Sequence, residues 1–211
     1  MKLTKYEHAC FTLEKDGEVL VVDPGVFTTD FAAPEHVTGV VITHEHADHF
    51  DRALLDAIVA KNPQVTIIGH DTIMQQINDL PTISVNAGDA ITIGTFVLEF
   101  FGGEHAVIHE SFTPIANLGV LINQKVYYPG DSFTVPNKPV DVLALPVAAP
   151  WMKISEAFDF VANIKPRIAF PTHDAILSDA GKSLPDRMLP PHAESFGTSY
   201  QRLSAPLHID D

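Results

Sequence analysis

The chain has 211 residues, of which 45% are hydrophobic, so it is long enough for one domain with a well-filled interior. Lys and Arg total 13 against 27 Asp and Glu, which gives a formal net charge of −14. Because nucleic-acid phosphates are bound by clustered Lys and Arg, and this chain has no basic run, we expect no nucleic-acid partner. No apolar run approaches the roughly 20 residues of a membrane-spanning helix, so we expect no membrane partner.

The N-terminal residues and the single cysteine favour a cytoplasmic location. Residues 1–8 lack the apolar segment of a secretory signal, and Cys10 has no second cysteine with which to form an internal disulfide. Cys10 lies in an apolar stretch, where a buried core thiol is favoured over a catalytic one, because cysteine is among the most frequently buried residue types.

The first part of the chain predicts a hairpin followed by alternating strands and helices. Residues 9–14 and 18–22 flank Lys15-Asp16-Gly17, and Asp-Gly is a strong hairpin signal. The elements predicted next are a buried strand at 40–43, an amphipathic helix at 51–62 with Asp51 as its N-cap, a strand at 65–69 and a helix at 71–78. This alternation points to an α/β arrangement.

The second part of the chain repeats the order of strands followed by strand-helix-strand. The predicted strands lie at 90–93, 96–101, 117–122, 125–128, 142–145 and 167–170. A helix is expected at 155–164, with Ser155 as its cap and Pro166 as its stop. The tail from about Ser178 is rich in Pro and Gly, and we expect it to wrap the surface with a short helix near 193–203.

Four metal-type side chains occur within six positions directly after the predicted strand at 40–43: His44, His46, Asp48 and His49. On an extended chain His44 and His46 point to the same side, and a turn at Ala47 would bring the other two close. Imidazole and carboxylate groups without thiolate suit zinc, manganese(II) or iron(II). One open catalytic ion does not need so many groups from one loop, so we expect a two-metal centre.

The spacing His-x-His-x-Asp-His resembles the signature of the metallo-β-lactamase-fold hydrolases. The resemblance implies an α/β (α+β) fold, a four-layer αββα sandwich in which residues 1–211 form one domain with two similar halves, roughly 1–85 and 86–211. Periodicity alone would give only "α/β or α+β". His105, Asp131 and His173 each follow a predicted strand, and in order and context they resemble the third, fourth and fifth motifs of that fold.

The resemblance also implies a ligand set for two divalent ions, zinc first, with manganese(II) or iron(II) as alternatives. One ion would take His44, His46 and His105, the other Asp48, His49 and His173, with Asp131 between them. His109 is the alternative to His105. We favour His105 because it lies closest after its strand, where a rigid sheet positions ligands best.

Four further residues are candidates for a supporting or substrate role: Asp23, His8, Trp151 and Lys153. Asp23 resembles a family acid that supports a ligand histidine, and a turn-capping Asp is the alternative. His8 partly matches openings of the branch that includes L-ascorbate-6-phosphate lactonase, although Glu7 stands where that branch has Gly; an ordinary core or surface histidine fits equally. Trp151 could wall the pocket and Lys153 could meet an anionic substrate, or the segment could simply pack at a helix entry.

Together these expectations describe a hydrolase. Two ions would share a hydroxide that attacks a carbonyl or phosphoryl centre, and Asp48 is the candidate that orients it and shuttles its proton. We expect a lactonase-like reaction on an ester-type bond of a small metabolite that could be anionic. The alternatives are a phosphodiesterase-type hydrolase, an iron-dependent oxidoreductase of the same fold and a non-catalytic metal-binding protein. An acidic surface also leaves room for a homo-oligomer.

Overall fold

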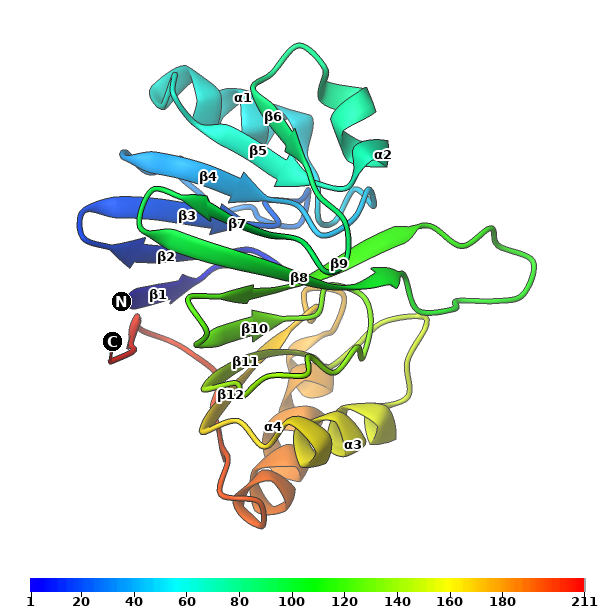
Figure 1. The fold of residues 1–211 in the computed structure, drawn as a ribbon. Coiled ribbons are helices and arrows are strands. Elements are labelled where there is room, and N and C mark those ends of the chain that lie inside the picture. Colours follow the sequence, from blue (N-terminus) through cyan, green and yellow to red (C-terminus); the bar gives the residue numbers. More distant parts are fainter. Residues whose placement is uncertain (211) are drawn as a thin grey trace.

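The computed structural model describes residues 1–210, in which two mixed sheets face each other and helices cover their outer faces (Figure 1). The first sheet has the order β14 (Leu207–His208), β1 (Lys2–Lys5), β2 (Phe11–Lys15), β3 (Glu18–Val22), β4 (Val37–Val41), β5 (Thr66–Gly69) and β6 (Thr82–Ser84). The second has the order β13 (Ser199–Tyr200), β12 (Ile168–Thr172), β11 (Val142–Pro146), β10 (Val126–Tyr128), β9 (Ala116–Ile122), β8 (Phe96–Glu104) and β7 (Ala90–Ile93).

The helices form the two outer layers (Figure 1). Helices α1 (Arg52–Lys61) and α2 (Asp71–Met74), the latter continued by a 3-10 turn at Gln75–Ile77, cover the first sheet. Helices α3 (Ile154–Ile164) and α4 (Asp179–Glu194) cover the second. Within residues 1–210, none of the helices has the length and apolar character needed to cross a bilayer.

Alternating side chains on the strands fill three separate apolar layers. Val40 on β4 packs toward the helices of its own sheet, whereas its neighbour Val41 packs into the layer between the sheets. In the second sheet Leu143 packs toward α3 and α4, and Ala144 packs between the sheets. Successive side chains on a strand point to opposite faces, so both sheets are buried on both sides. The four-layer αββα sandwich is therefore confirmed.

Both sheets share one design, in which antiparallel strands lead into parallel ones. β1, β2 and β3 are antiparallel neighbours and β3 to β6 are parallel; β7 to β10 are antiparallel and β10 to β13 are parallel. Parallel neighbours need crossover connections, which the four helices supply at β4–β5, β5–β6, β11–β12 and β12–β13. The loops that carry the predicted ligands leave the C-terminal ends of β4, β8, β10 and β12.

The local signals of the first sheet are confirmed. In the predicted hairpin, Asp16 and Gly17 have φ of +51° and +83°, as a type I′ turn between twisted strands requires. Helix α1 begins after Asp51, whose carboxylate accepts the backbone N–H of Ala53 at 2.7 Å. Cys10 is fully buried, and burial raises the pKa of its thiol to about 12, which confirms a core role.

In the second half the predicted helix at 155–164 is confirmed as α3, but its predicted cap and the predicted tail helix were wrong. Ser155 does not cap α3: the helix begins at Ile154, because the Glu156 carboxylate accepts the backbone N–H of Lys153 at 2.6 Å and fixes the start earlier. The tail helix is α4, capped by Ser178, and not a short helix near 193–203. It contains Pro185, Pro190 and Pro191, which disfavour a helix interior, but its fully buried Leu189 and Ala193 pack with the core under the second sheet.

Candidate metal centre

Polar side chains converge at the edge where the two sheets meet, carried by loops that leave the C-terminal ends of strands. The first sheet supplies His8 after β1, Asp23 after β3 and residues 44–49 after β4. The second sheet supplies His105 after β8, Asp131 after β10 and His173 after β12. The structure brings all the predicted ligands to this one place, although 129 residues separate His44 from His173 in the chain.

The converging side chains form two groups, in each of which the potential ligand atoms lie within 4.8 Å of one another. Group one consists of His44, His46, His105 and Asp131. Group two consists of His8, Asp48, His49 and His173. This division matches the ligand sets that the resemblance implied, with His8 added. His109 belongs to neither group: it is exposed, and its Nδ1 accepts the backbone N–H of Ser111 at 3.1 Å.

Asp131 lies between the two groups. Its Oδ1 is 3.1 Å from His49 Nε2, and its Oδ2 is 3.0 Å from His173 Nε2 in group two. The same Oδ2 is 3.4 Å from His105 Nε2 in group one. The carboxylate is almost completely buried, at 2% exposure, and therefore faces both groups instead of the solvent. This is the position that a residue shared by two cations requires.

The buried nitrogen and oxygen atoms of the site suit bound cations. Nε2 of His49, His105 and His173 is buried and makes no well-aligned hydrogen bond, although each lies 3.0–3.4 Å from a carboxylate oxygen of Asp131. On each imidazole the other nitrogen is engaged: Nδ1 of His105 donates to Ala106 O at 2.5 Å and Nδ1 of His173 to Ala148 O at 2.6 Å. A neutral imidazole held in this way offers a lone pair on Nε2. Divalent cations placed between these imidazoles and Asp131 would give both the nitrogens and the carboxylate oxygens well-directed partners.

His44 and His46 present ring nitrogens to a common point. Thr43 Oγ1 donates to Asp23 at 2.6 Å and lies 3.1 Å from Nδ1 of His44, so it can accept that N–H and leave the lone pair on Nε2. Nε2 of His44 lies 3.1 Å from Nδ1 of His46. Without a cation, Nδ1–H of His46 can donate to Nε2 of His44. Once that proton is lost, the same two nitrogens are close enough to bind one cation, so this pair also fits a metal.

Burial and charge tune these groups for a cation. Burial, reinforced by the neighbouring His49, lowers the pKa of His44 well below its ordinary value and keeps the ring neutral. Burial alone would raise the pKa of Asp131, but His49 and the other imidazoles hold it well below the usual value. Burial alone would lower the pKa of His173, but the carboxylates of Asp131 and Asp48 raise it to about 9. The metal-free site therefore holds protons that a cation has to displace.

Asp23 lies against His49, one of the expected metal ligands. Its Oδ2 accepts Nδ1–H of His49 at 2.6 Å, and its Oδ1 accepts the backbone N–H of Thr43 at 2.8 Å. Asp23 is fully buried, and its backbone has φ of +43°. The carboxylate thereby fixes the tautomer of His49 that leaves Nε2 free toward Asp131.

His8 contacts Asp48 and has a defined tautomer. The backbone N–H of Ala175 points at Nδ1 of His8, 3.3 Å away, so that nitrogen is the acceptor and Nε2 carries the proton. Nε2 then donates to Asp48 Oδ2 at 3.0 Å. The backbone carbonyl of His8 also accepts the N–H of His173 at 3.1 Å. His8 therefore connects two ligand loops, and it is fully buried in group two and not at the rim.

Trp151 lies against the candidate metal centre, whereas Lys153 is exposed to solvent. Nε1 of Trp151 donates to Asp131 Oδ2 at 2.7 Å, and its ring centroid lies 6.2 Å from that of His105, so it walls the centre. The side chain of Lys153 is exposed, and among residues 1–210 it has no contact with a candidate ligand. The structure therefore gives no support to Lys153 as a substrate contact.

Two structural residues escaped the sequence prediction. Asn117, at the start of β9, accepts the N–H of Asp131 at 2.9 Å and donates to Pro129 O at 2.9 Å, so it fixes the turn that presents Asp131. Gly25 packs against the ligand loop so closely that a Cβ there would lie 1.9 Å from the carbonyl oxygen of Asp48. The Asp-Pro-Gly sequence signals a turn, but no local pattern shows which backbone the glycine meets.

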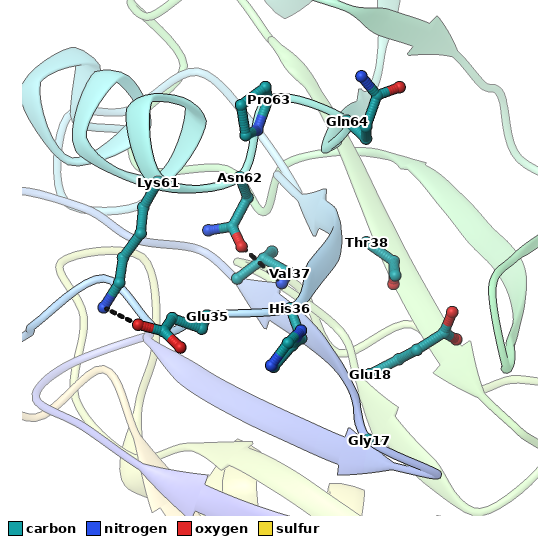
Figure 2. A pocket seen from close by; sticks show the side chains of 10 residues that line it. All are labelled: Gly17, Glu18, Glu35, His36, Val37, Thr38, Lys61, Asn62, Pro63 and Gln64. Carbon is teal, nitrogen blue, oxygen red and sulfur yellow. Dashed lines mark hydrogen bonds and ion pairs between the residues drawn. The ribbon is translucent and has the colours of Figure 1, made fainter.

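Two of the pockets formed by residues 1–210 lie at opposite ends of the strands. One, of 440 Å³, has His46 and His105 in its wall and continues along residues 106–115. The other, of 470 Å³, lies at the N-terminal ends of β3 and β4 and is lined by Glu18, Glu35 and Lys61 among others (Figure 2). Figure 2 shows Lys61 paired with Glu35, 3.7 Å away. Of these two pockets, the first adjoins the histidine groups, so it is the candidate substrate site.

Comparison with known proteins places the chain in a family. A family model described as "Beta-lactamase superfamily domain" matches residues 2–173. Protein Rv0786c of Mycobacterium tuberculosis is 34% identical over 189 residues, covering 87% of this chain and 89% of that protein. UPF0173 protein PYRAB01190 of Pyrococcus abyssi is 32% identical over 182 residues, covering 82% and 83%. The solved structure of Igni18, a novel metallo hydrolase from Ignicoccus hospitalis, matches with a TM-score of 0.75 at 20% identity and covers 99% of each chain.

The αββα sandwich with paired histidine and aspartate groups at the edge of its sheets defines a metal-dependent hydrolase of the metallo-β-lactamase fold. The chain belongs to the beta-lactamase superfamily, and several of its relatives carry the name UPF0173 metal-dependent hydrolase. The relationship to the hydrolases that was expected from residues 44–49 is confirmed.

Proposed function

We propose that this chain hydrolyses an ester-type bond of a small metabolite at two divalent ions, one held by each histidine group. The observation that carries the proposal is Asp131, whose two carboxylate oxygens face His49 and His173 on one side and His105 on the other. Bound ions would polarise the carbonyl or phosphoryl group and provide a nucleophile from water at neutral pH. Imidazole and carboxylate donors suit zinc first, with manganese(II) and iron(II) as alternatives.

Asp48 is the residue that we assign to the attacking water. Its side chain is 22% exposed, whereas His8, His49 and His173 around it are at most 3% exposed. Within residues 1–210 its contacts all involve Oδ2, so Oδ1 can accept a hydrogen bond from a water in the cleft. Burial would raise the pKa of Asp48, but the imidazoles of His173 and His8, 3.3 and 3.0 Å from its Oδ2, hold it far below the usual value. The group is therefore an anionic acceptor that orients the water.

Trp151 and Asn117 preserve the geometry of Asp131 during the reaction. The indole N–H holds Oδ2, and Asn117 holds the backbone of the same residue. A carboxylate fixed from both sides cannot rotate away as charge develops at the reacting centre, and such preorganisation is a large part of catalysis. The indole ring also covers part of the centre and limits the access of bulk water.

The proposal is tested by metal analysis together with a substrate panel. The protein is loaded with zinc, manganese(II) or iron(II) and assayed against a lactone, a phosphodiester and a thioester, with lactone hydrolysis expected first. His46→Ala and Asp131→Ala are expected to lower both metal content and turnover. His208→Ala is the matched control, because this exposed histidine on β14 lies outside both groups.

Each other outcome points to a different function. Unchanged metal content in both ligand variants would contradict the assigned site. Bound metal without turnover on any substrate would favour a metal-binding protein, and bound iron with redox activity would favour an oxidoreductase. Fast cleavage of the phosphodiester alone would favour the phosphodiesterase-type alternative.

A further inference from the structure

The pocket beside His46 and His105 has an apolar wall that the proposed reaction does not explain. Its volume of 440 Å³ lies in the range of small-molecule sites. Apart from the two histidines it is lined entirely by the connection between β8 and β9, which extends away from the sheets in Figure 1. Its apolar lining residues are Ala106, Val107, Ile108, Phe112, Pro114 and Ile115.

The connection is a closed loop with defined hydrogen bonds at its base. The N–H of His105 donates to Ile115 O at 3.0 Å, and the N–H of Ala106 donates to Asp131 O at 2.8 Å. Within the loop, Phe112 N–H donates to His109 O at 3.0 Å. The base of the loop is thus tied directly to two members of group one, so its apolar side chains have a fixed relation to the candidate metal ligands.

The loop exposes apolar surface that a bound molecule would cover. Val107 is 71% exposed, Phe112 62% and Ile108 37%. Exposed apolar side chains gathered around a pocket commonly mark a site of interaction. Because His46 and His105 form the other wall, a molecule that covers this surface also reaches group one.

The charge of the lining selects between substrate classes. The lining holds one carboxylate, Glu110, and neither Lys nor Arg, in a chain of net charge −14. A second negative charge placed along residues 106–115, away from the ion proposed at His46 and His105, would meet Glu110 with no Lys or Arg in the lining to balance it. The pocket therefore disfavours an anionic group in the part of the substrate that lies along this loop.

We propose that this pocket binds an uncharged, apolar acyl or alkyl group of the substrate and holds the scissile bond against His46 and His105. This inference rests on the proposed hydrolase function and adds the substrate class: neutral esters or lactones with an apolar chain or ring. Contact with Ile108 and Phe112 determines the chain-length preference. The acyl group remains in the pocket while the alcohol leaves toward the solvent.

A matched set of esters tests the substrate class. 4-Nitrophenyl acetate, 4-nitrophenyl hexanoate and mono-4-nitrophenyl adipate share one leaving group and differ in chain length or in a terminal carboxylate. We expect kcat/KM for hexanoate to exceed that for acetate at least tenfold, and the adipate to lose this advantage. Ile108→Ser and Phe112→Ser should each reduce the hexanoate-to-acetate ratio about tenfold. Leu184→Ser, at an apolar position on α4 that is 50% exposed, should leave the ratio unchanged.

A binding measurement separates failure of this inference from failure of the proposed function. Trp151 is the single tryptophan and lies against His105, so its fluorescence reports on the adjoining pocket. Hexanamide, a neutral probe that is not an ester, should change this fluorescence saturably in the wild type and at least tenfold more weakly in Phe112→Ser. If no ester is hydrolysed but hexanamide binds in this way, the proposed hydrolysis is contradicted and the proposed apolar binding site is supported.

Three results would overturn the inference. The first is hydrolysis without preference among the three esters, or with preference for the adipate. The second is hexanamide binding that both loop variants leave unchanged. The third is a dimer that Phe112→Ser converts to a monomer in light scattering, with hexanamide binding unaltered, since the loop would then pack against a second copy of the chain.

Discussion

His8 Nε2 donates to Asp48 Oδ2 at 3.0 Å, and it does so because the N–H of Ala175 occupies the other ring nitrogen. The contact joins two segments that lie 40 residues apart in the chain. The backbone carbonyl of His8 also accepts the N–H of His173, so His8 contacts that ligand loop as well. We infer that His8 positions Asp48 and does not itself bind a metal, because its Nε2 carries the proton.

Two amide substitutions separate this role from simple packing. Gln at position 8 can place an N–H near the position of Nε2, whereas Asn can reproduce only the acceptor near Nδ1. We expect His8→Asn to weaken the second metal ion about 10- to 100-fold and His8→Gln to weaken it clearly less. Competition with a chromophoric chelator measures both affinities. Equal losses in the two variants would show that hydrogen bonding to Asp48 is not what His8 contributes.

Asp23→Asn tests the support of His49. Asp23 accepts hydrogen bonds at both oxygens, from Thr43 and His49, and Asn has only one acceptor oxygen. One buried donor would lose its partner, so we expect about 10- to 100-fold weaker metal binding. Asp141→Asn, which removes a charge from the partly exposed pair with Arg167 at 2.8 Å, should leave metal binding unchanged. Equal metal affinity in both variants would exclude the support role.

Gly25→Ala should disturb the ligand loop more than it disturbs the fold. A Cβ there would lie 1.9 Å from Asp48 O and 2.4 Å from His49 N, so the loop has to move. We expect a loss of stability of about 1–3 kcal/mol together with loss of metal. Gly17→Ala is the control: φ of +83° makes Ala costly by about 1–2 kcal/mol, but the site is distant and metal content should be kept. Denaturant unfolding and elemental analysis give the two readouts.

Metal binding should release protons in a pH-dependent manner. The pKa of His173 is raised to about 9, so below pH 9 the metal-free ring carries on Nε2 the proton that a cation has to displace. Affinity should therefore rise as pH rises to about 9, by about tenfold per pH unit for the His173 proton, and then rise less steeply once that proton is lost. Calorimetry at pH 7 and pH 9.5, in buffers of different ionisation enthalpy, measures the released protons. An equal release at both pH values would contradict the prediction.

Local signals in the sequence were sufficient for much of the fold. The Asp-Gly turn needs only two residues with positive φ, and the cap of α1 needs only Asp51 and the N–H groups that follow it. Residues 44–49 could be interpreted because their metal-type side chains are close together in the chain. Each of these features depends on residues within a few positions of one another, so it can be predicted from one sequence alone.

The parts that escaped prediction depend on distant contacts. Helix α4 forms across three prolines because Leu189 and Ala193 are buried against other elements. The short strand β14 exists only because Leu207 and His208 pair with β1. Asn117 and Gly25 matter through the backbone segments that they touch, which lie 14 and 23 positions away. No pattern in the neighbouring residues encodes such partners.

Each histidine group draws side chains from both sheets, and this has a mechanical consequence. His44 and His46 come from the first sheet, while His105 and Asp131, in the same group, come from the second. A cation coordinated by such a set links the two sheets at the edge where they meet. Removal of the ions should therefore destabilise both sheets together, and the melting temperature should fall while unfolding stays a single transition.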